Sequence, residues 1–367
     1  MFKNFKVVKS IIILFSFVAI GIIVNSCSKE KEKKITDLKT EEEKYIIELK
    51  NKYPYLANYI DEVNNMSIEE RRGLLTMVGI TDTVLSEETI KTLKDNHVSG
   101  VILFNYNIVD EEQLKKLTSD LKKYVNKNML ISIDEEGGEV FRIPFDKYKD
   151  ISAKMIGDSN SIEYAYNIAY NKAKFLKDMG INMILGPLCD VPSNKDSYIY
   201  DRSFSTNIET VSKMVEATIK AQKDAGIISV VKHFPGHGDT SVNSHSEFPV
   251  IDKTLEELKN KELIPFQKAI DLGAEMVLIA HIKNKYIDDE LPASMSEKYR
   301  KILEEDMDFN GVIITDDLVM TGKIKSTINY GINLTSNIYK NVEDMFRNIE
   351  PDIISCAKVL KIMRENT

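Results

Sequence analysis

The 367-residue chain has no tryptophan, only three cysteines and only five histidines. Without tryptophan, any aromatic surface on which a ligand stacks must be built from tyrosine or phenylalanine. The cysteines, at positions 27, 189 and 356, are too few and too scattered for a disulfide framework or a zinc cluster. The composition therefore excludes the small disulfide-rich domains and the zinc-finger class.

The chain also lacks an excess of positive charge. Its formal net charge is −8, and residues 1–26 contain three lysines and no acidic residue, so the remainder carries −11. An acidic body cannot neutralise phosphates, which argues against nucleic acid as a partner. Hydrophobic residues make up 43% of the chain and charged residues 29%, as in ordinary globular proteins, so a full core can be buried.

The first 27 residues have the pattern of an export signal. Three lysines precede an uncharged apolar run from Ile11 to Val24, which is too short to span a bilayer comfortably but suits a signal-peptide core. The following Ser26-Cys27 resembles the lipobox of bacterial lipoproteins. We expect residues 1–27 to be a lipoprotein signal peptide with lipidated Cys27, the alternative being an uncleaved anchor. Either way, the body is exported and held on the periplasmic or cell-surface side of a bacterial membrane.

Residues 28–65 predict a charged tether followed by an N-terminal helical stalk. Residues 28–34 alternate charges, which is typical of a structureless linker. A polar helical pattern then runs from Thr36 to about Asn65 and is broken at Pro54. A capping box, Ser67 to Glu70, opens the next helix. We therefore expect residues 66–367 to form one domain, which is large enough for an enzyme.

Within that domain, short apolar runs alternate with amphipathic helical segments. Seven strand–helix repeats, each strand buried along its length, indicate a parallel α/β architecture. The runs are Met77–Ile80, Gly100–Phe104, Met129–Ile133, Ile181–Leu185, Ile227–Val231, Met276–Ala280 and Gly311–Ile314. The clearest helical segments are Glu111–Val125, Glu163–Met179, Ile208–Asp224 and Leu255–Leu272.

Polar clusters follow most of these runs, which favours a (β/α)8 barrel of the triosephosphate-isomerase type over an open sheet. In a barrel, the carboxyl ends of all strands meet at one face, whereas an open sheet gathers ligands at a single switch point. The eighth strand is the weakest element of the pattern, and Asp352–Ile354 is its best candidate. We expect the eighth unit to be short or incomplete.

The stretch from Lys232 to His245 holds three of the five histidines, directly after a predicted strand. A glycine-containing loop of this kind can carry an acid/base group, and His245 is a candidate because histidine titrates near neutrality. The alternative is a metal site built from these histidines and Asp239. Lys232 stands beside them and no second cluster with ligand-like spacing appears, so we expect no metal and no other cofactor.

Asp316 stands at the end of the seventh run, where its carboxylate would point into the barrel mouth. There it could attack an anomeric carbon or stabilise a cation, whereas Asp317 is better placed to cap the next helix. Two other clusters could bind hydroxyl groups. Asp134 ends a strand, with Arg142 eight residues later, and Arg202 offers a planar donor fork.

With these residues, the chain resembles the bacterial β-N-acetylglucosaminidases of glycoside hydrolase family 3 over about residues 66–322. The sequence Lys-His-Phe-Pro-Gly-His-Gly-Asp-Thr at 232–240, followed by Ser244-His245, carries most of the resemblance. Supporting matches are Gly100–Phe104, Asp134 with Glu136-Gly137-Gly138, Asp190-Val191, Arg202-Ser203-Phe204, Ala280-His281-Ile282, Pro292-Ala293-Ser294 and Asp316-Asp317-Leu318.

The resemblance implies a barrel fold, no cofactor and retention of anomeric configuration. It implies that Asp316 is the nucleophile and that His245 is the acid/base. It also implies that the first sugar is held by a set of five polar residues, which are Asp134, Arg142, Arg202, Lys232 and His233. The implied substrates are amino-sugar oligosaccharides or muropeptides carrying terminal GlcNAc, and we expect a monomer.

Three features depart from the family pattern. Asn243 stands where an aspartate usually orients the acid/base histidine; an amide can still accept the ring N–H but supplies no charge. Glu139 replaces a common basic residue, which would add negative charge near the sugar. The segment after Gly322 is shorter than the family's usual ending. These departures leave a second hypothesis open, in which the protein is a surface lipoprotein that binds muropeptides with weakened or no activity. A histidine acid/base also leaves open a third, in which phosphate replaces water and the reaction is phosphorolysis.

Overall fold

The computed structural model describes residues 40–240, 248–320, 326–341 and 343–366. A first compact unit ends at Asp61, and a second covers Glu62–Thr367. In the first, a helix over residues 40–52 stops before Pro54, as the sequence predicts, and Pro54 begins a 3₁₀ turn, η1 (Pro54–Leu56). Cys27 and the predicted signal peptide lie outside the described residues. Among the helices that are described, none has both the length and the apolarity needed to cross a bilayer.

The second unit begins as its sequence predicts. Helix α2 (Ala57–Asn64) includes the division at Asp61, and the next helix, α3 (Ile68–Leu74), starts with a complete capping box. The Ser67 hydroxyl accepts the Glu70 N–H at 3.2 Å, and the Glu70 carboxylate accepts the Ser67 N–H at 2.7 Å. Two N–H groups at the helix start are thereby satisfied.

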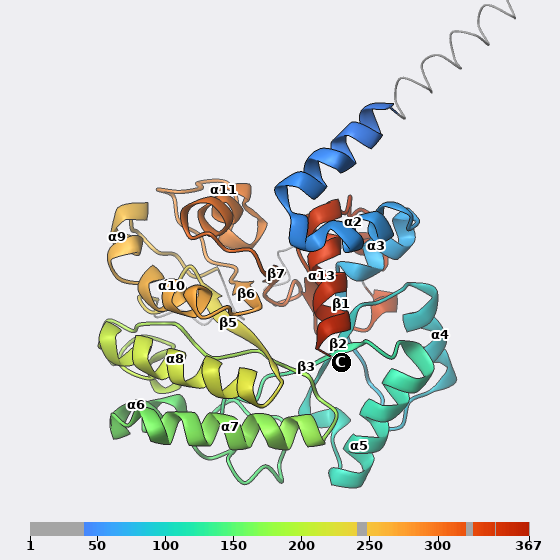
Figure 1. The fold of residues 1–367 in the computed structure, drawn as a ribbon. Helices are drawn as coiled ribbons and strands as arrows, with labels where there is room; N and C mark the ends of the chain where they lie inside the picture. Colours follow the sequence, from blue (N-terminus) through green and yellow to red (C-terminus); the bar gives the residue numbers. More distant parts are fainter. Residues whose placement is uncertain (1–39, 241–247, 321–325, 342, 367) are drawn as a thin grey trace, which may run out of the picture. The chain divides into compact units, whose positions relative to one another are not determined.

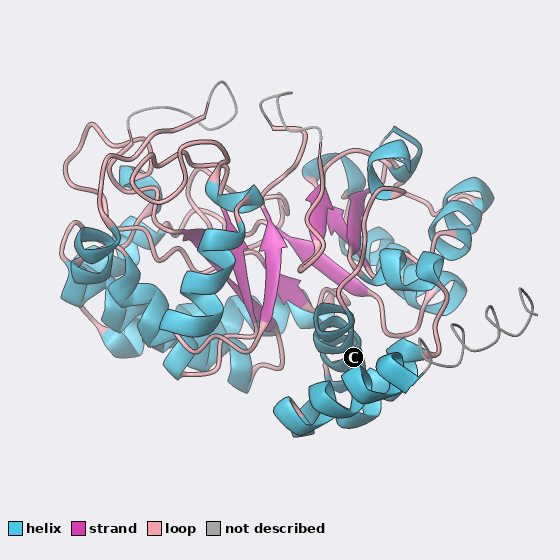
Figure 2. Ribbon diagram, turned by 90° about the horizontal axis from the view of Figure 1, so that it is seen from above, coloured by secondary structure: helices cyan, strands magenta, loops and turns pink. Residues whose placement is uncertain are grey.

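Eight parallel strands form the centre of the second unit, and helices surround them (Figures 1 and 2). The strands are β1 (Thr76–Gly79), β2 (Gly100–Leu103), β3 (Leu130–Ile133), β4 (Met183–Ile184), β5 (Ile228–Phe234), β6 (Met276–Ile279), β7 (Val312–Thr315) and β8 (Asn333–Thr335). The helices after α3 are α4 (Glu87–Asp95), α5 (Glu111–Asp120), α6 (Ala153–Ser159), α7 (Ile162–Asp178), α8 (Ile208–Asp224), α9 (Leu255–Asn260), α10 (Leu263–Asp271), α11 (Glu297–Lys301), α12 (Glu343–Phe346) and α13 (Ile353–Glu365). The architecture is the predicted (β/α)8 barrel.

The strands follow one another around the barrel in the order β7-β6-β5-β4-β3-β2-β1-β8. The first and last strands pair in parallel, with Met77 opposite Leu334, and a bridge between Ile314 and Ile332 links β7 to the start of β8. The barrel is therefore nearly closed. Gly79 permits the close approach of β1 to the end of β8, because a Cβ at this position would lie 2.0 Å from the Ser336 carbonyl oxygen.

The eighth unit is short, as expected, but the position predicted for its strand is wrong. Asp352 does not belong to a strand; its side chain accepts the Ile354 N–H at 2.9 Å and caps α13. The strand lies earlier, at Asn333–Thr335, where a polar sequence hides it from a search for apolar runs. The Asn333 side chain is fully buried, and its amide donates to the carbonyls of Leu75 and Ile328 at 3.2 and 2.9 Å. Helix α13 completes the unit by packing against α3 and β7.

Candidate active site

A polar cavity of about 160 Å³ opens at the carboxyl ends of the strands. Residues that follow β2, β3, β7 and β8 line it, together with Lys232 and His233 at the end of β5, as expected where parallel strands converge in a barrel. Six of the predicted site residues contribute to its wall, which are Asp134, Arg142, Arg202, Lys232, His233 and Asp316. The structure thus brings these six residues together at one cavity, and their roles stay predictions.

Asp316 follows β7 directly and is only partly exposed, toward this cavity. One of its carboxylate oxygens accepts the Asp317 N–H at 2.9 Å. Burial alone would raise the pKa of Asp316, but the nearby His281, His233 and Lys232 outweigh burial and lower it. Asp316 is thus ionised at neutral pH, as a carboxylate nucleophile must be.

The His281 ring holds the residues after β7 in place through both of its nitrogens. Its Nε2 lies 2.9 Å from the Asp317 carbonyl oxygen, which can only accept, so this nitrogen carries a proton. The other ring nitrogen lies 2.6 Å from the Ser294 hydroxyl. The Asp317 carboxylate accepts N–H groups from Val319 and Ser336 at 3.2 and 3.0 Å. We expected Asp317 to cap the next helix, but no helix begins between β7 and β8 in the described residues; Asp317 instead stabilises the local turn and ties the β7 loop to the β8 loop.

Lys232 and Asp134 meet across the cavity floor. The Lys232 ammonium lies 2.6 Å from one Asp134 oxygen, and Arg142 approaches the other at 3.5 Å. Lys232 is almost fully buried; burial would lower its pKa, but the carboxylates of Asp134 and Glu136 outweigh burial and raise it. The ammonium is therefore a fixed positive charge, and Asp134 keeps acceptor capacity for hydroxyl groups of a ligand.

Glu136 is the partner that sequence reasoning missed among the site residues. Its carboxylate accepts two parallel bonds from the Arg202 guanidinium at 2.9 and 2.7 Å and lies 2.7 Å from the Lys232 ammonium. Burial would raise the pKa of Glu136, but the two cations hold it well below its usual range. The Arg202 fork that we expected to bind a ligand is thus occupied by Glu136. Only a tertiary structure could reveal this, since the two residues are 66 positions apart.

His233 is held by a buried aspartate that the site prediction also omitted. Asp190 is fully buried after β4; one of its oxygens lies 2.8 Å from His233 Nδ1, and the other accepts the His237 N–H at 2.6 Å. Burial and the neighbouring His233 lower the pKa of His237 to about 4, so this ring is neutral at physiological pH. The signal for Asp190 was present in the sequence as a polar residue after a predicted strand.

The remaining predicted residues are not in the described part of the cavity. His245 and Asn243 lie outside the described residues, so their assignment stays a prediction. Glu139, which we expected to place negative charge near the sugar, is solvent-exposed and does not line the cavity. Among the described residues, no group of three or more His, Cys, Asp or Glu is arranged to hold a metal ion.

A second carboxylate cluster adjoins the β3 loop, and its residues are not part of the cavity wall. Glu135 is 1% exposed and accepts the N–H groups of Arg142 and Ile143 at 2.7 and 3.2 Å. Burial raises the pKa of Glu135 to about 7 and also raises that of Asp146. The buried Lys172 ammonium donates to the main-chain oxygens of Glu135 and Glu136 at 3.3 and 2.9 Å. This cluster fixes the backbone of the loop that presents Asp134 and Arg142.

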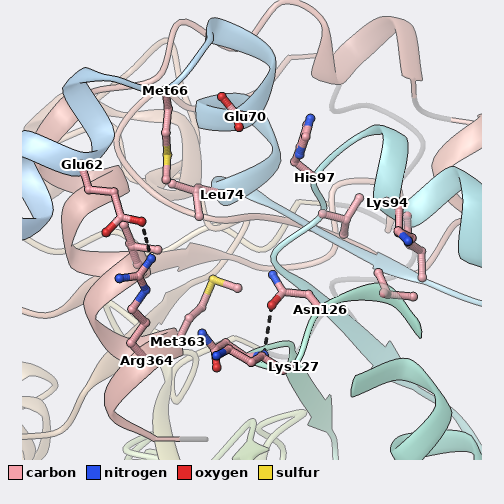
Figure 3. Close-up of a pocket in the computed structure, with 15 residues that line it drawn as sticks. Glu62, Met66, Glu70, Leu74, Lys94, His97, Asn126, Lys127, Met363 and Arg364 are labelled. Carbon is pink, nitrogen blue, oxygen red and sulfur yellow. Dashed lines mark hydrogen bonds and ion pairs between the residues drawn. The ribbon is translucent and has the colours of Figure 1, made fainter. Parts of the chain in front are cut away.

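A larger cavity, of about 510 Å³, lies at the opposite end of the barrel (Figure 3). Leu74, His97 and Asn128 line it just before strands β1, β2 and β3 begin. Its ionic side chains include Glu62 and Arg364, which pair with each other across it (Figure 3). It lacks the converging set of buried charges found at the other end, so its size does not make it the candidate active site.

Comparisons with known proteins found relatives that are similar in sequence and in fold. A family model described as the N-terminal domain of glycosyl hydrolase family 3 matches residues 67–333. The beta-hexosaminidase of Actinobacillus pleuropneumoniae serotype 3 is 34% identical over 255 residues, which are 68% of this chain and 73% of that protein. A family 3 β-N-acetylglucosaminidase from Paenibacillus matches with a TM-score of 0.75 and 28% identity, over 81% of this chain and 62% of that one. NagZ from Neisseria gonorrhoeae, solved in complex with N-trifluoroacetyl-D-glucosamine, matches with a TM-score of 0.72 and 29% identity, over 80% and 90%.

Proposed function

We propose that this chain, which belongs to glycosyl hydrolase family 3 and is a glycoside hydrolase, is a retaining exo-β-N-acetylglucosaminidase. Its substrates would be peptidoglycan fragments or chitooligosaccharides that end in β-linked GlcNAc. The observation that carries the proposal is the ionised Asp316, which shares one cavity with Asp134, Lys232 and His233. The relatives named beta-hexosaminidase and the NagZ structure support GlcNAc as the sugar.

The proposed reaction has two steps. In the first, Asp316 attacks the anomeric carbon, the bond to the leaving oxygen breaks, and that oxygen takes a proton from His245. In the second, His245 removes a proton from water, which attacks the same carbon and releases Asp316. Two inversions give β-configured GlcNAc. The role of His245 rests on its place in the sequence motif.

The described cavity suits the binding of one sugar. The Asp134 carboxylate would accept bonds from vicinal hydroxyls, while Lys232 and Arg142 keep it charged and fixed in place. His233, oriented by Asp190, would donate or accept at the next hydroxyl. Because Glu136 holds the Arg202 fork, Arg202 would act mainly by positioning Glu136 and Lys232 and only secondarily by contacting the sugar.

The proposal is tested with a chromogenic β-GlcNAc glycoside and the soluble body of the protein. The substitution Asp316→Ala should reduce kcat by at least about a thousandfold, because the group that forms the covalent intermediate is lost. A matched control is Asp252→Asn, an exposed aspartate paired with Lys285, which should leave kcat unchanged. A 5-fluoro-GlcNAc fluoride should trap the covalent intermediate. The mass of the intact wild-type protein should then increase by one sugar, and that of Asp316→Ala should not change. Equal rates for wild type and Asp316→Ala would contradict the assignment.

A second candidate function is a muropeptide-binding surface lipoprotein with little or no activity. It is favoured by Asn243, which cannot supply the charge that usually stabilises a protonated acid/base histidine. Calorimetric binding of GlcNAc without turnover between pH 4 and 8 would support it, and ready turnover would exclude it. Adding inorganic phosphate to the same assay separates phosphorolysis, which yields GlcNAc 1-phosphate, from hydrolysis.

We further propose that the protein is exported and anchored to a bacterial membrane through a lipid on Cys27. The apolar run before Ser26-Cys27 supports this location. Labelling of the full chain with a fatty-acid probe, compared with Cys27→Ser, tests it. The wild type should incorporate the probe and the variant should not. The same compartment holds peptidoglycan fragments, which agrees with the proposed substrate.

A further inference from the structure

An exposed tyrosine stands on the rim of the candidate active site. Phe104 follows β2 and lines the cavity, and Tyr106, in the turn η2 (Asn105–Asn107), stacks on it. The two ring centroids lie 5.4 Å apart with 17° between the planes. The Arg142 guanidinium lies 5.6 Å from the centre of the Phe104 ring. Tyr106 is nevertheless 51% exposed, so part of its ring surface is open to a ligand.

The backbone under this tyrosine is fixed. Asn107 is fully buried, and its amide donates to the carbonyls of Ile80 and Asp82 at 2.9 and 3.0 Å. Its side-chain oxygen accepts the Phe104 N–H at 2.9 Å, and the Gln113 amide donates to its carbonyl at 3.0 Å. A ring with two torsions on such a turn loses little entropy when a ligand contacts it.

Tyr106 also lies near two charged residues of the cavity wall. Burial and the negative charge of Asp317 raise the pKa of the Tyr106 hydroxyl, and Arg142 opposes the shift. The ring is therefore near both Asp317, which adjoins the proposed nucleophile, and Arg142, which contacts Asp134 in the floor. The cavity, of about 160 Å³, has the scale of one sugar ring, so the next ring of an oligosaccharide substrate would lie outside it.

We propose that Tyr106, backed by Phe104, is the stacking platform for the sugar on the leaving-group side of the scissile bond. Sugar rings present C–H groups on one face, and these pack on aromatic faces. Since the chain has no tryptophan, a tyrosine or phenylalanine must serve. The inference rests on the proposed function and deepens it, because it makes oligosaccharides, and not single sugars with small leaving groups, the preferred substrates.

The test compares triacetylchitotriose with the azide of β-GlcNAc, whose leaving group cannot reach the rim. For Tyr106→Ala, the ratio of kcat/KM for the trisaccharide to kcat/KM for the azide should fall about tenfold, as expected for a lost aromatic contact. Tyr106→Phe should keep most of the ratio, because stacking uses the ring. Tyr124→Ala, an exposed tyrosine far from the cavity wall, should keep it fully. An unchanged ratio in Tyr106→Ala, or an equal fall in Tyr106→Phe, overturns the platform.

A binding measurement separates this inference from the proposed function, since it needs no turnover. In an Asp316→Ala background, calorimetry should show that Tyr106→Ala weakens the trisaccharide about tenfold more than it weakens GlcNAc. If the wild type hydrolyses neither substrate, the proposed activity fails while this result still supports the platform. Equal weakening of both ligands, or none, overturns the platform whatever the activity.

Discussion

The loop after β3 carries two neighbouring glutamates in opposite electrostatic states. Glu136 pairs with Lys232 and Arg202, which line the cavity, and its pKa is held far below the usual range; we call this set of contacts the cavity face. Glu135 contacts neither cation, and its pKa is raised to about 7; we call its surroundings the interior face. Both side chains are almost fully buried, so burial penalises both charges. The difference comes from what each carboxylate contacts.

Glu136 contacts two cations directly, Lys232 at 2.7 Å and Arg202 through two parallel bonds. Glu135 accepts main-chain N–H groups and lies beside the Asp146 carboxyl, which raises its pKa further, while the nearby Lys172 ammonium donates to main-chain oxygens. Desolvation is thus offset on one face and only partly offset on the other. The cavity face carries fixed charges for a ligand, and the interior face holds the loop in shape with a carboxyl that titrates near neutral pH.

The largest effect should come from removing the negative charge of Glu136. Glu136→Gln leaves Lys232 and Arg202 buried with one carboxylate fewer, which should lower the free energy of unfolding by about 3 kcal/mol and abolish turnover. Urea denaturation at pH 7 measures the first and the chromogenic assay the second. Glu139→Gln, on the same loop but exposed, is the matched control and should change neither. A Glu136→Gln variant as stable as this control would contradict the account of the cavity face.

The interior face should respond to pH. Because the pKa of Glu135 rises from 4.5 to about 7 on folding, the folded state retains a proton that the unfolded state releases. This contribution to stability is fully present below pH 4.5 and is lost as the pH rises through about 7, by about 3 kcal/mol. Glu135→Gln cannot ionise, so its stability should gain by that amount relative to wild type between pH 4.5 and 8.

Urea denaturation of both proteins at the two pH values measures this difference. Glu139→Gln again serves as control, since an exposed glutamate should show no such shift. A stability difference between Glu135→Gln and wild type that does not change with pH would mean that Glu135 is ionised throughout, and the contrast between the two faces would disappear.

The smallest effect concerns the geometry of the Glu136 pair. Arg202→Lys keeps the charge but replaces two parallel bonds by one, which should cost about 1 kcal/mol of unfolding free energy. Arg347→Lys is the control, because its exposed pair with Glu343 should contribute almost nothing. Denaturation curves for the two variants give the comparison. Equal stabilities would show that charge alone, without the fork geometry, holds Glu136.

The barrel was predictable because seven of its strands are apolar runs followed by polar residues. The predicted helix at Ile208–Asp224 matches α8 to the residue, whereas the predicted Leu255–Leu272 divides into α9 and α10. The eighth strand escaped because Asn333 is buried, with carbonyl partners from distant positions. Local pattern carries no information about such partners, so a buried polar strand looks like a loop.

Candidate site residues at strand ends were predictable for the same reason. Asp134, Lys232 and Asp316 each follow or end an apolar run, and all three line the cavity. The occupation of the Arg202 fork by Glu136 was not predictable, because it depends on how two loops far apart in sequence meet. The sequence indicates which groups reach the mouth of the barrel, and the tertiary structure determines which of them remain available to a ligand.

The pairing of β1 with β8 has a consequence for the order in which the molecule forms. Met77 meets Leu334 across almost the whole domain, so the barrel cannot close until the last strand has left the ribosome. Until then one edge of β1 stays unpaired, and contacts this distant in sequence form slowly. Because the pairing of β1 with β8 forms last, the barrel stays unclosed while the chain is being synthesised. An unclosed barrel is compatible with passage through a translocation channel before folding. For the export that we propose, translocation would then precede barrel closure.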